Sequence, residues 1–277
     1  MNDLVIQGPR LTPDDLQTLR QDTGADAVHA PRPGMARLRN VSERGPVAPF
    51  CAARSLDFTF LDRPLRLADF RLVAMDMDST LITIECIDEI ADMIGVKPQV
   101  AAITAAAMRG ELDFPSALRQ RVRLLAGLEE NALQRVYDER LRLSPGAENL
   151  LAAAQSAGLK TLLVSGGFTF FTERLQRRLN LDATLANTLE VRDGKLTGQV
   201  LGAIVDADAK AAKVREVCAQ IGCEPRQAIV LGDGANDLKM MALAGLSVAF
   251  RAKPVVQQQA HVALNHVGLD GVLNLLD

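Results

Sequence analysis

The chain is poor in the features that mark membrane, secreted or nucleic-acid-binding proteins. No apolar run among its 277 residues approaches the roughly 20 residues needed to cross a bilayer. Its 31 Lys and Arg residues are mixed with 34 Asp and Glu residues, and the net charge of −3 provides no basic face for nucleic acid. No early segment combines a basic start with a long apolar stretch. We therefore expect a cytoplasmic protein without nucleic-acid or membrane partners.

Cysteines are few and scattered, and no internal repeat or low-complexity tract is present. The four cysteines form no CxxC pair, so neither a zinc site nor a disulfide framework is indicated, and we interpret them as small apolar core residues: Cys51, Cys86, Cys218 and Cys223. Hydrophobic residues make up 48% of the chain, which is enough to build the core of one large or two modest domains.

The texture of the sequence changes near residue 70. Before it, “DLVIQG” is typical of a strand, “TPDDLQTLRQDTG” of a helix capped by Thr12, and Pro and Gly break up the later segments “APRPG” and “RGPVAP”. After it, strands alternate with helices, which predicts a Rossmann-like parallel sheet covered on both faces. The predicted fold is therefore α/β, with residues 1–70 as a small N-terminal α+β domain and residues 71–277 as the core.

Three short apolar strands run straight into polar or glycine-rich sequence. They are “FRLVAM” before Asp76, “KTLLV” before Ser165 and “QAIVL” before Gly232. In an open α/β sheet, ligands bind at the carboxyl ends of the strands, so we expect these three ends to meet at one crevice.

A helical insert separates the first two of these strands. Residues 83–142 contain apolar residues at helical spacing in “CIDEIADMIGV” and “PSALRQRVRLLAG”, too much helix for one crossover connection. We predict a helical cap over the crevice. Further on, “TLEVRDGKLTGQV” predicts a hairpin that turns at Asp193 and Gly194.

The carboxylates at the strand ends predict a cation site. Asp76, Asp78, Asp233 and Asp237 fall at or just after strand ends. Like charges this close need compensation, and a hard divalent cation such as Mg²⁺ prefers carboxylate, carbonyl and water oxygens. Because bound Mg²⁺ commonly shares its remaining sites with phosphate oxygens, phosphoryl transfer is the candidate reaction.

The other groups needed for phosphoryl transfer are present. Asp76 could attack phosphorus, and Asp78 could protonate the leaving oxygen and later take a proton from water. Ser165 and the glycines after it offer a hydroxyl and closely approaching N–H groups, and Lys210 offers a mobile positive charge. Each motif alone has a plainer explanation as a solvated turn, and Asn236 in “GDGAND” could simply cap a helix that opens at “DLKMMALAG”.

Together, “DMDST”, “SGG”, Lys210 and “GDGAND” resemble the four motifs of the haloacid dehalogenase superfamily of phosphohydrolases. The resemblance covers the chain from about residue 70 onward. Within that superfamily, “ECIDEIA”, “FPSALRQRV” and “VSGGF” resemble the branch that hydrolyses O-phospho-L-serine to serine and phosphate, the final step of serine biosynthesis.

The resemblance implies a role for each matching residue. Asp76 would be the nucleophile and Asp78 the general acid and base. The side chains of Asp76 and Asp233 and the backbone carbonyl of Asp78 would hold Mg²⁺, supported by Asn236 and Asp237. The substrate-binding residues would be Glu85 for the ammonium group, Arg121 for the carboxylate, Met108 and Phe114 for an apolar wall, and Ser165, Gly166, Lys210 and Asn236 around the phosphate. Without the resemblance, Arg121 would pass for a solvated cap arginine and Glu85 for a first-turn helix glutamate.

Two alternatives stay open, as does the role of the first 70 residues. A phosphotransferase would pass the phosphoryl group to an alcohol such as homoserine, and an amino-acid sensor would keep the fold only as a scaffold. Intact Asp76 and Asp78 argue against a sensor, which needs no nucleophile. Some relatives carry an N-terminal ACT-like module, for which residues 1–70 are short and Pro-rich. We favour packing or a homodimer contact over ligand sensing for this region.

Overall fold

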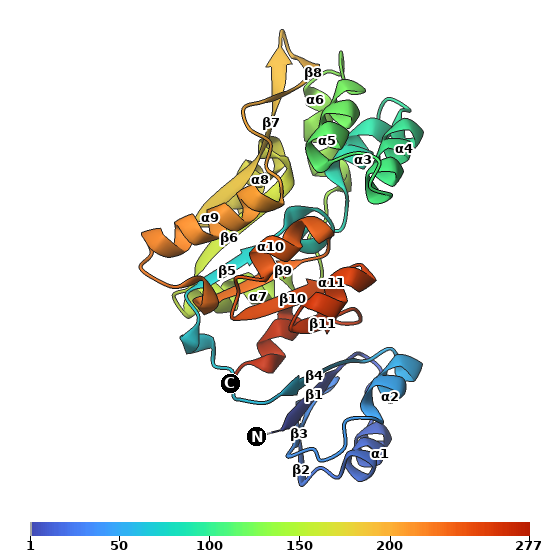
Figure 1. Cartoon of the computed structure of the whole chain (residues 1–277), viewed down its shortest axis with the longest axis vertical. Helices are drawn as coiled ribbons and strands as arrows, with labels where there is room; N and C mark the ends of the chain where they lie inside the picture. The colour runs from blue at the N-terminus through green and yellow to red at the C-terminus, as the bar shows by residue number, and fades with distance from the viewer. Residues whose placement is uncertain (1) are drawn as a thin grey trace.

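The computed structural model describes residues 2–277 and consists of an N-terminal unit, a central sheet with helices on both faces, and a helical cap (Figure 1). The N-terminal unit and the cap lie at opposite ends of the central sheet in that view. No helix within the described residues is long and apolar enough to cross a membrane.

The N-terminal unit has β-α-β-β-α-β order. Its elements are β1 (Asp3–Gln7), α1 (Pro13–Thr23), β2 (Ala27–Arg32), β3 (Met35–Arg39), α2 (Val47–Arg54) and β4 (Asp57–Leu61). The strands form an antiparallel sheet in the order β2-β3-β1-β4, the ferredoxin-like arrangement. The predicted cap of α1 is confirmed, because the Thr12 side chain accepts the Asp15 N–H in a capping box.

Strand β1 is buried on both faces, which accounts for its unbroken apolar sequence. Leu4 and Ile6 join the cluster beneath α1 and α2, whereas Val5 joins the main core of the molecule. Strand β1 is therefore packed from both sides, by the helices of its own unit and by residues 269–275 near the C-terminus.

The central sheet confirms the α/β prediction. Its strand order is β11-β10-β9-β5-β6-β7-β8, with only β8 antiparallel to its neighbour. Its strands are β5 (Leu72–Met75), β6 (Lys160–Phe168), β7 (Ala183–Arg192), β8 (Lys195–Leu201), β9 (Ala228–Gly232), β10 (Leu246–Phe250) and β11 (Val262–Leu264). Val73 faces one buried cluster and Ala74 the other, as expected for a strand covered on both faces.

Helices cover the sheet on both sides (Figure 1), and short helical segments lie between the elements and after the last strand. The helices are α7 (Ala147–Ser156), α8 (Thr169–Leu179), α9 (Ala207–Gln220), α10 (Leu238–Met241) and α11 (Pro254–Gln259). The short turns are η1 (Leu67–Asp69), η2 (Met77–Leu81), η4 (Pro225–Gln227), η5 (Ala235–Asp237) and η6 (Leu269–Leu275).

The cap is inserted between β5 and β6. It comprises α3 (Cys86–Asp92), α4 (Lys97–Met108), α5 (Phe114–Arg123), α6 (Asn131–Arg135) and the turn η3 (Val136–Arg140). Its two connections to the core lie side by side, because the Thr83 N–H donates to the Arg142 carbonyl at 2.9 Å. The predicted hairpin, β7–β8, turns at Asp193 (φ 51°) and Gly194 (φ 72°), two positive φ values that suit a tight hairpin.

The hairpin also supports the cap. The Gly127 N–H donates to the Leu196 carbonyl, and the Leu196 N–H donates to the Leu128 carbonyl, both at 2.8 Å. Gly198 (φ 83°) lies against Arg123, with room for a hydrogen only. The cap is thus attached to the core by two chain connections and by the hairpin.

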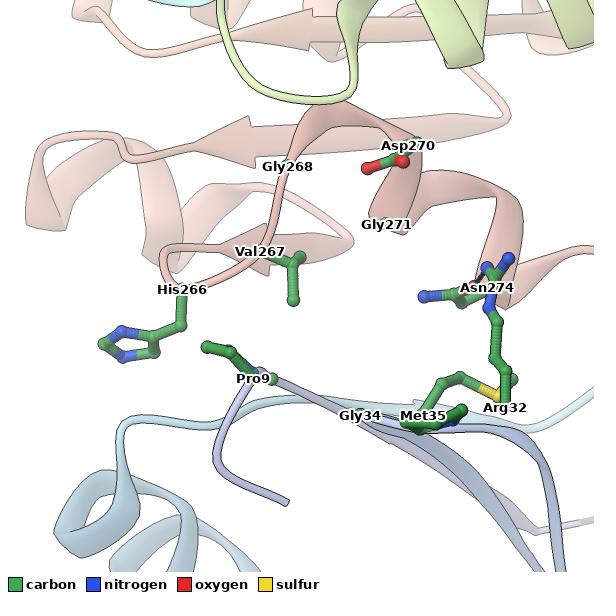
Figure 2. Close-up of a pocket in the computed structure, with 12 residues that line it drawn as sticks. Pro9, Arg32, Gly34, Met35, His266, Val267, Gly268, Asp270, Gly271 and Asn274 are labelled. Atoms are coloured by element: carbon green, nitrogen blue, oxygen red, sulfur yellow. Dashed lines mark hydrogen bonds between the residues drawn. The ribbon is translucent and has the colours of Figure 1, made fainter.

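Polar groups join the N-terminal unit to the core as well, at the segment that follows β11. Asp57, buried at the start of β4, accepts the N–H groups of Asn265, His266 and Val267 at 2.8, 2.8 and 3.1 Å. A pocket of about 430 Å³ lies beside this contact, with Gly34 on one wall and Asn274 on the other (Figure 2). Residues from both units line it, and the catalytic candidates are not among them.

Three of the four cysteines are core residues, as predicted. Cys51, Cys86 and Cys218 are buried, Cys223 is half-buried, and all four are free thiols.

Candidate active site

The three predicted strands are neighbours, so their ends meet as expected. β5 lies between β6 and β9 and is parallel to both. Asp76, Ser165 and Asp233 therefore leave the sheet at the same edge, above which the cap sits. Met77, between the two aspartates, is fully buried in the core. It therefore packs inward, whereas Asp76 and Asp78 lie at the crevice.

Lys210 joins this edge from the first turns of α9. Its ammonium group lies 2.9 Å from Asp76 Oδ1 and 2.7 Å from Asp237 Oδ1, and its side chain is fully buried. Burial alone would lower the pKa of Lys210, but the carboxylates of Asp237 and Asp76 raise it above its usual value. The expectation of a mobile charge is wrong, because two ion pairs in a buried site fix the lysine in place.

The carboxylates outnumber the cation beside them. Oxygens of Asp76, Asp233 and Asp237 lie within 4.8 Å of one another. Burial and the charge of Asp237 raise the pKa of Asp76 well above its usual value, although Lys210 opposes the shift. Burial, with the charges of Asp237 and Glu85, raises the pKa of Asp233 to about 7. Such a cluster is balanced only when further positive charge is bound.

Asp237 is a supporting group within this cluster. Its Oδ1 pairs with Lys210, and its Oδ2 accepts the N–H groups of Asp233 and Gly234 at 3.1 and 3.0 Å. Both oxygens are thus occupied by donors. Asp76 and Asp233 remain the carboxylates better placed to bind a cation.

Asp78 is suited to proton transfer. Its Oδ1 accepts the Cys86 N–H at 3.0 Å, at the start of the cap. Burial, with the charge of Glu85, raises the pKa of Asp78 to about 7. A carboxyl group that titrates near neutral pH can donate a proton and later accept one, as a general acid and base must.

The Ser165–Gly167 segment approaches the catalytic loop closely. The Ser165 hydroxyl oxygen accepts the Gly167 N–H at 2.8 Å. A Cβ on Gly167 would lie 2.6 Å from Asp78 Oδ2, and one on Gly166 would lie 2.9 Å from the Phe114 ring. Only glycine fits at either position without displacing these groups.

The cap brings three of its four predicted residues toward this edge. Phe114 contacts Gly166, and Glu85 accepts the Ser79 hydroxyl at 2.6 Å. Burial lowers the pKa of the Arg121 guanidinium, while Asp88, Glu85 and Asp78 lie near enough to oppose that shift. Met108 differs, because it is 66% exposed at the end of α4 and forms no buried wall with Phe114.

Glu85 and Asn236 do not play the simple structural roles that a helix terminus would give them. Glu85 precedes α3 but makes no capping hydrogen bond. Asn236 lies within η5 rather than before it, and the position before the four-residue α10 belongs to Asp237. The predicted cap by Asn236 is therefore wrong, because the Asp237 carboxylate takes over the N–H groups of this loop.

Two buried residues were missed from the sequence. Thr80 donates its hydroxyl to Asp233 Oδ1 at 3.1 Å, and Asn187 bonds to Gly166. Thr80 lies in the “DMDST” motif and could have been found from its position. Asn187 lies on β7, far from any motif in sequence.

A divalent cation fits this donor set. Asp76 and Asp233 supply carboxylate oxygens at a buried edge, and Lys210 is the cation already paired there. Oxygen ligands without His or Cys favour a hard ion over zinc or copper. The residues thus form an acidic cluster able to hold a metal ion.

Comparison with known protein families identifies the family to which the chain belongs. The family model of haloacid dehalogenase-like hydrolases matches residues 73–242, which include every strand end described above. The chain belongs to this family of hydrolases.

Individual proteins similar to this chain include several phosphoserine phosphatases. A phosphoserine phosphatase of Polaromonas sp. is 57% identical over 217 residues, covering 76% of this chain and 92% of its own. The crystal structure of a probable phosphoserine phosphatase from Vibrio cholerae, in unliganded form, has 39% identity and a TM-score of 0.86, covering 99% of this chain and 86% of that one. A phospho-aspartyl intermediate analogue of phosphoserine phosphatase has 36% identity and a TM-score of 0.71, covering 75% and 99%.

Proposed function

We propose that the protein is a Mg²⁺-dependent phosphoserine phosphatase, which hydrolyses O-phospho-L-serine to L-serine and phosphate and so completes serine biosynthesis. The observation that carries this function is the contact set around Asp76: a buried carboxylate, fixed by Lys210 and flanked by Asp78. The phosphoserine phosphatases among its relatives support the choice of substrate.

Asp76 is the nucleophile in this proposal. Its Oδ1 accepts the Met77 N–H at 2.7 Å and pairs with Lys210, so Oδ2 is the oxygen directed at phosphorus. Attack forms an aspartyl phosphate and breaks the bond to the serine oxygen. Lys210 and the Ser165 hydroxyl neutralise and bind the phosphoryl oxygens.

Asp78 moves the proton at each step. In its protonated form it donates to the departing serine oxygen, and as a carboxylate it then takes a proton from the water that attacks the aspartyl phosphate. The two steps return both aspartates to their initial states. A pKa of about 7 lets both forms of Asp78 be populated at neutral pH.

Asp76, Asp233 and the Asp78 carbonyl would hold Mg²⁺. When bound, the ion supplies charge that offsets the crowded carboxylates and the phosphate. Asp237 keeps Lys210 and the Gly234 loop in place around it.

The cap would select the amino acid. Arg121 would bind the carboxylate through its planar fork and Glu85 the ammonium group, which fixes the two charges of serine at one separation. Phe114 already contacts Gly166. Met108 would join it as the apolar wall when the cap closes on substrate.

For the N-terminal unit we propose an ACT-like domain spanning residues 1–70. All six elements of a β-α-β-β-α-β unit are present, and β2 is an edge strand with exposed side chains. An edge of this kind can pair with a second copy, so a homodimer contact is the role that we assign to it.

Phosphate release tests the function. Wild type and Asp76→Asn would be assayed with O-phosphoserine and a panel of other phosphate esters, with Mg²⁺ and with chelator. We expect Mg²⁺-dependent release that favours phosphoserine, and a loss of at least about a thousandfold in Asp76→Asn, because the amide is no nucleophile. Full activity in the variant would refute the mechanism. Phosphohomoserine formed in place of free phosphate, when homoserine is added, would refute the hydrolase assignment.

A further inference from the structure

Strand β6 departs from its neighbour at the place where phosphate is proposed to bind. Val164 pairs with Leu185 on β7, and the next pair joins Phe168 to Asn187. Four residue steps on β6 thus match two on β7, so residues 165–167 are pushed out of the ladder toward the crevice. A segment that leaves the ladder needs other partners to hold its shape.

Asn187 supplies such a partner at the point where the ladder resumes. Its side chain is buried, with 1% exposure, and its Nδ2 donates to the Gly166 carbonyl at 2.8 Å. Its Oδ1 accepts the Val205 N–H at 2.8 Å. Because one contact requires a donor and the other an acceptor, the orientation of the amide is fixed by the chain itself.

The first contact determines how the Ser165 hydroxyl is used. The Gly166 carbonyl belongs to the peptide whose N–H, on Gly167, donates to Ser165 Oγ. Asn187 thus holds one end of this peptide and Ser165 the other. With its oxygen accepting from Gly167, the serine hydroxyl has its hydrogen left to donate to a phosphate oxygen.

The second contact reaches the segment that carries Lys210. Val205 immediately precedes Asp206, which caps α9 by accepting two N–H groups of its first turn. The Lys210 N–H donates to the Asp206 carbonyl at 2.9 Å. One amide side chain therefore ties the serine segment to the start of the helix that presents the lysine.

We propose that Asn187 is a positioning residue for phosphate, setting the Ser165 hydroxyl and the Lys210 helix in register with each other. It does not touch the substrate. The inference rests on the proposed function for the identity of the phosphate-binding groups. It predicts that loss of Asn187 weakens the binding of phosphate and leaves the binding of serine unchanged.

Two substitutions separate the contacts. Asn187→Asp keeps an oxygen for the Val205 N–H but loses the donor to Gly166, whereas Asn187→Ala loses both without adding charge. Thr188→Ala, an exposed neighbour on the same strand, is the matched control. For each Mg²⁺-loaded protein, calorimetry would measure the binding of inorganic phosphate and of serine, and steady-state kinetics would measure kcat and KM.

We expect both Asn187 variants to bind phosphate at least about tenfold more weakly and to lose about ten- to a hundredfold in kcat, with serine affinity unchanged. Unchanged phosphate binding in either folded variant would overturn the proposal. Equal losses for phosphate and serine would assign Asn187 a general structural role and overturn it as well. If wild type binds phosphate but does not hydrolyse phosphoserine, the substrate assignment fails while the phosphate comparison still decides the role of Asn187.

Discussion

At the scale of single residues, the site combines three carboxylates with one lysine in a buried space. Asp76 and Asp237 share Lys210, and Asp233 is left with a threonine hydroxyl. The arrangement is electrostatically costly until a cation and a phosphate complete it. Functional residues held this way make the protein less stable in the absence of ligand.

The pH dependence of stability follows from Asp233. Its pKa of about 7 in the folded protein lies above the usual 3.8, so between these values the folded state binds a proton that the unfolded state lacks. Stability of the Mg²⁺-free protein should therefore fall as pH rises from 4 to 7. Asp233→Asn should raise the free energy of unfolding at pH 8 by about 2 to 4 kcal/mol.

Urea denaturation at pH 4.5 and pH 8, in chelator, measures this effect. The increase in the free energy of unfolding caused by Asp233→Asn should be smaller at pH 4.5 than at pH 8. Asp208→Asn, at an exposed site on α9, should change stability by less than about 0.5 kcal/mol at either pH. A destabilised Asp233→Asn at pH 8 would contradict the predicted electrostatic cost.

Arg121 gives a test of substrate selection. Arg121→Ala should lower kcat/KM for phosphoserine by an amount that corresponds to about 1.5 to 3 kcal/mol of transition-state stabilisation. The reason is that a charged hydrogen-bond partner of the carboxylate is removed. Phosphoethanolamine, which lacks the carboxylate, should be affected far less. Arg119→Ala, exposed on the same helix, serves as the control. Equal losses on both substrates would refute a role for Arg121 in binding the carboxylate.

Sequence alone predicted the residues that lie in motifs and missed those that reach the site from elsewhere. Asp76, Ser165 and Lys210 occupy their expected places because each follows from a strand end or a helix. Asn187 could not be found in this way, because its importance arises from a pairing irregularity between β6 and β7. The fixed state of Lys210 likewise depends on Asp237, whose orientation no spacing rule predicts.

At the scale of elements, the end of β6 is the segment that tolerates the least added volume. It runs four residues beyond the predicted “KTLLV”, and its glycines lie against both the catalytic loop and the cap. The helix expected at “DLKMMALAG” is instead a single short helix, α10, because η5 precedes it. Loops that carry binding groups follow their side-chain contacts more than their helix propensity.

Gly166 and Gly167 should differ in how well they tolerate substitution by alanine. In Gly167→Ala the methyl group would meet Asp78 Oδ2 at 2.6 Å and Met77 Cε at 2.8 Å, so we expect kcat/KM for phosphoserine to fall at least about a hundredfold. In Gly166→Ala it would meet the Phe114 ring at 2.9 Å, and a ring at the end of a side chain can move.

A second change isolates the Phe114 contact. Phe114→Leu shortens the side chain, so it should restore part of the activity lost in Gly166→Ala and none of that lost in Gly167→Ala. Steady-state kinetics of the two double variants, compared with Phe114→Leu alone, provides the measurement. Equal rescue of both glycine variants would show that Phe114 acts on the segment as a whole.

At the scale of the whole molecule, Asp57 is a principal link between the N-terminal unit and the central sheet. Its carboxylate accepts three backbone N–H groups from residues 265–267 and is buried. Asp57→Ala should lower the free energy of unfolding by about 2 to 4 kcal/mol, because three partly buried backbone donors lose one buried acceptor. Asp62→Ala, an exposed residue just past β4, is the control.

Chemical denaturation followed by two probes checks this prediction. Circular dichroism reports both units, and phosphatase activity reports the catalytic edge. Loss of ellipticity before loss of activity in Asp57→Ala would show the units separating, and a coincident shift of both transitions would show one cooperative fold. An unchanged midpoint would contradict the assigned role.

The architecture was largely predictable from sequence because, apart from the inserted cap and the β7–β8 hairpin, strands alternate with helices after residue 70. The N-terminal unit was harder, since its β1 lacks the alternation of a strand with one solvated face. That pattern is explained by η6, which lies against the second face of β1, while Val5 joins the main core. Long-range burial of this kind leaves no local signal.

The attachment of the cap to the β7–β8 hairpin restricts how substrate can enter. Backbone hydrogen bonds join Leu196 to Gly127 and Leu128, so we expect the hairpin and the cap to move together. We therefore expect the hinge of a cap movement below both, near the paired connections at Thr83 and Arg142 and at the base of β7. Rotation about that axis would separate Phe114, on the cap, from Gly166, on the core. We expect the gate for phosphoserine to open at that contact, with Asn187 at the pivot rather than on the moving side.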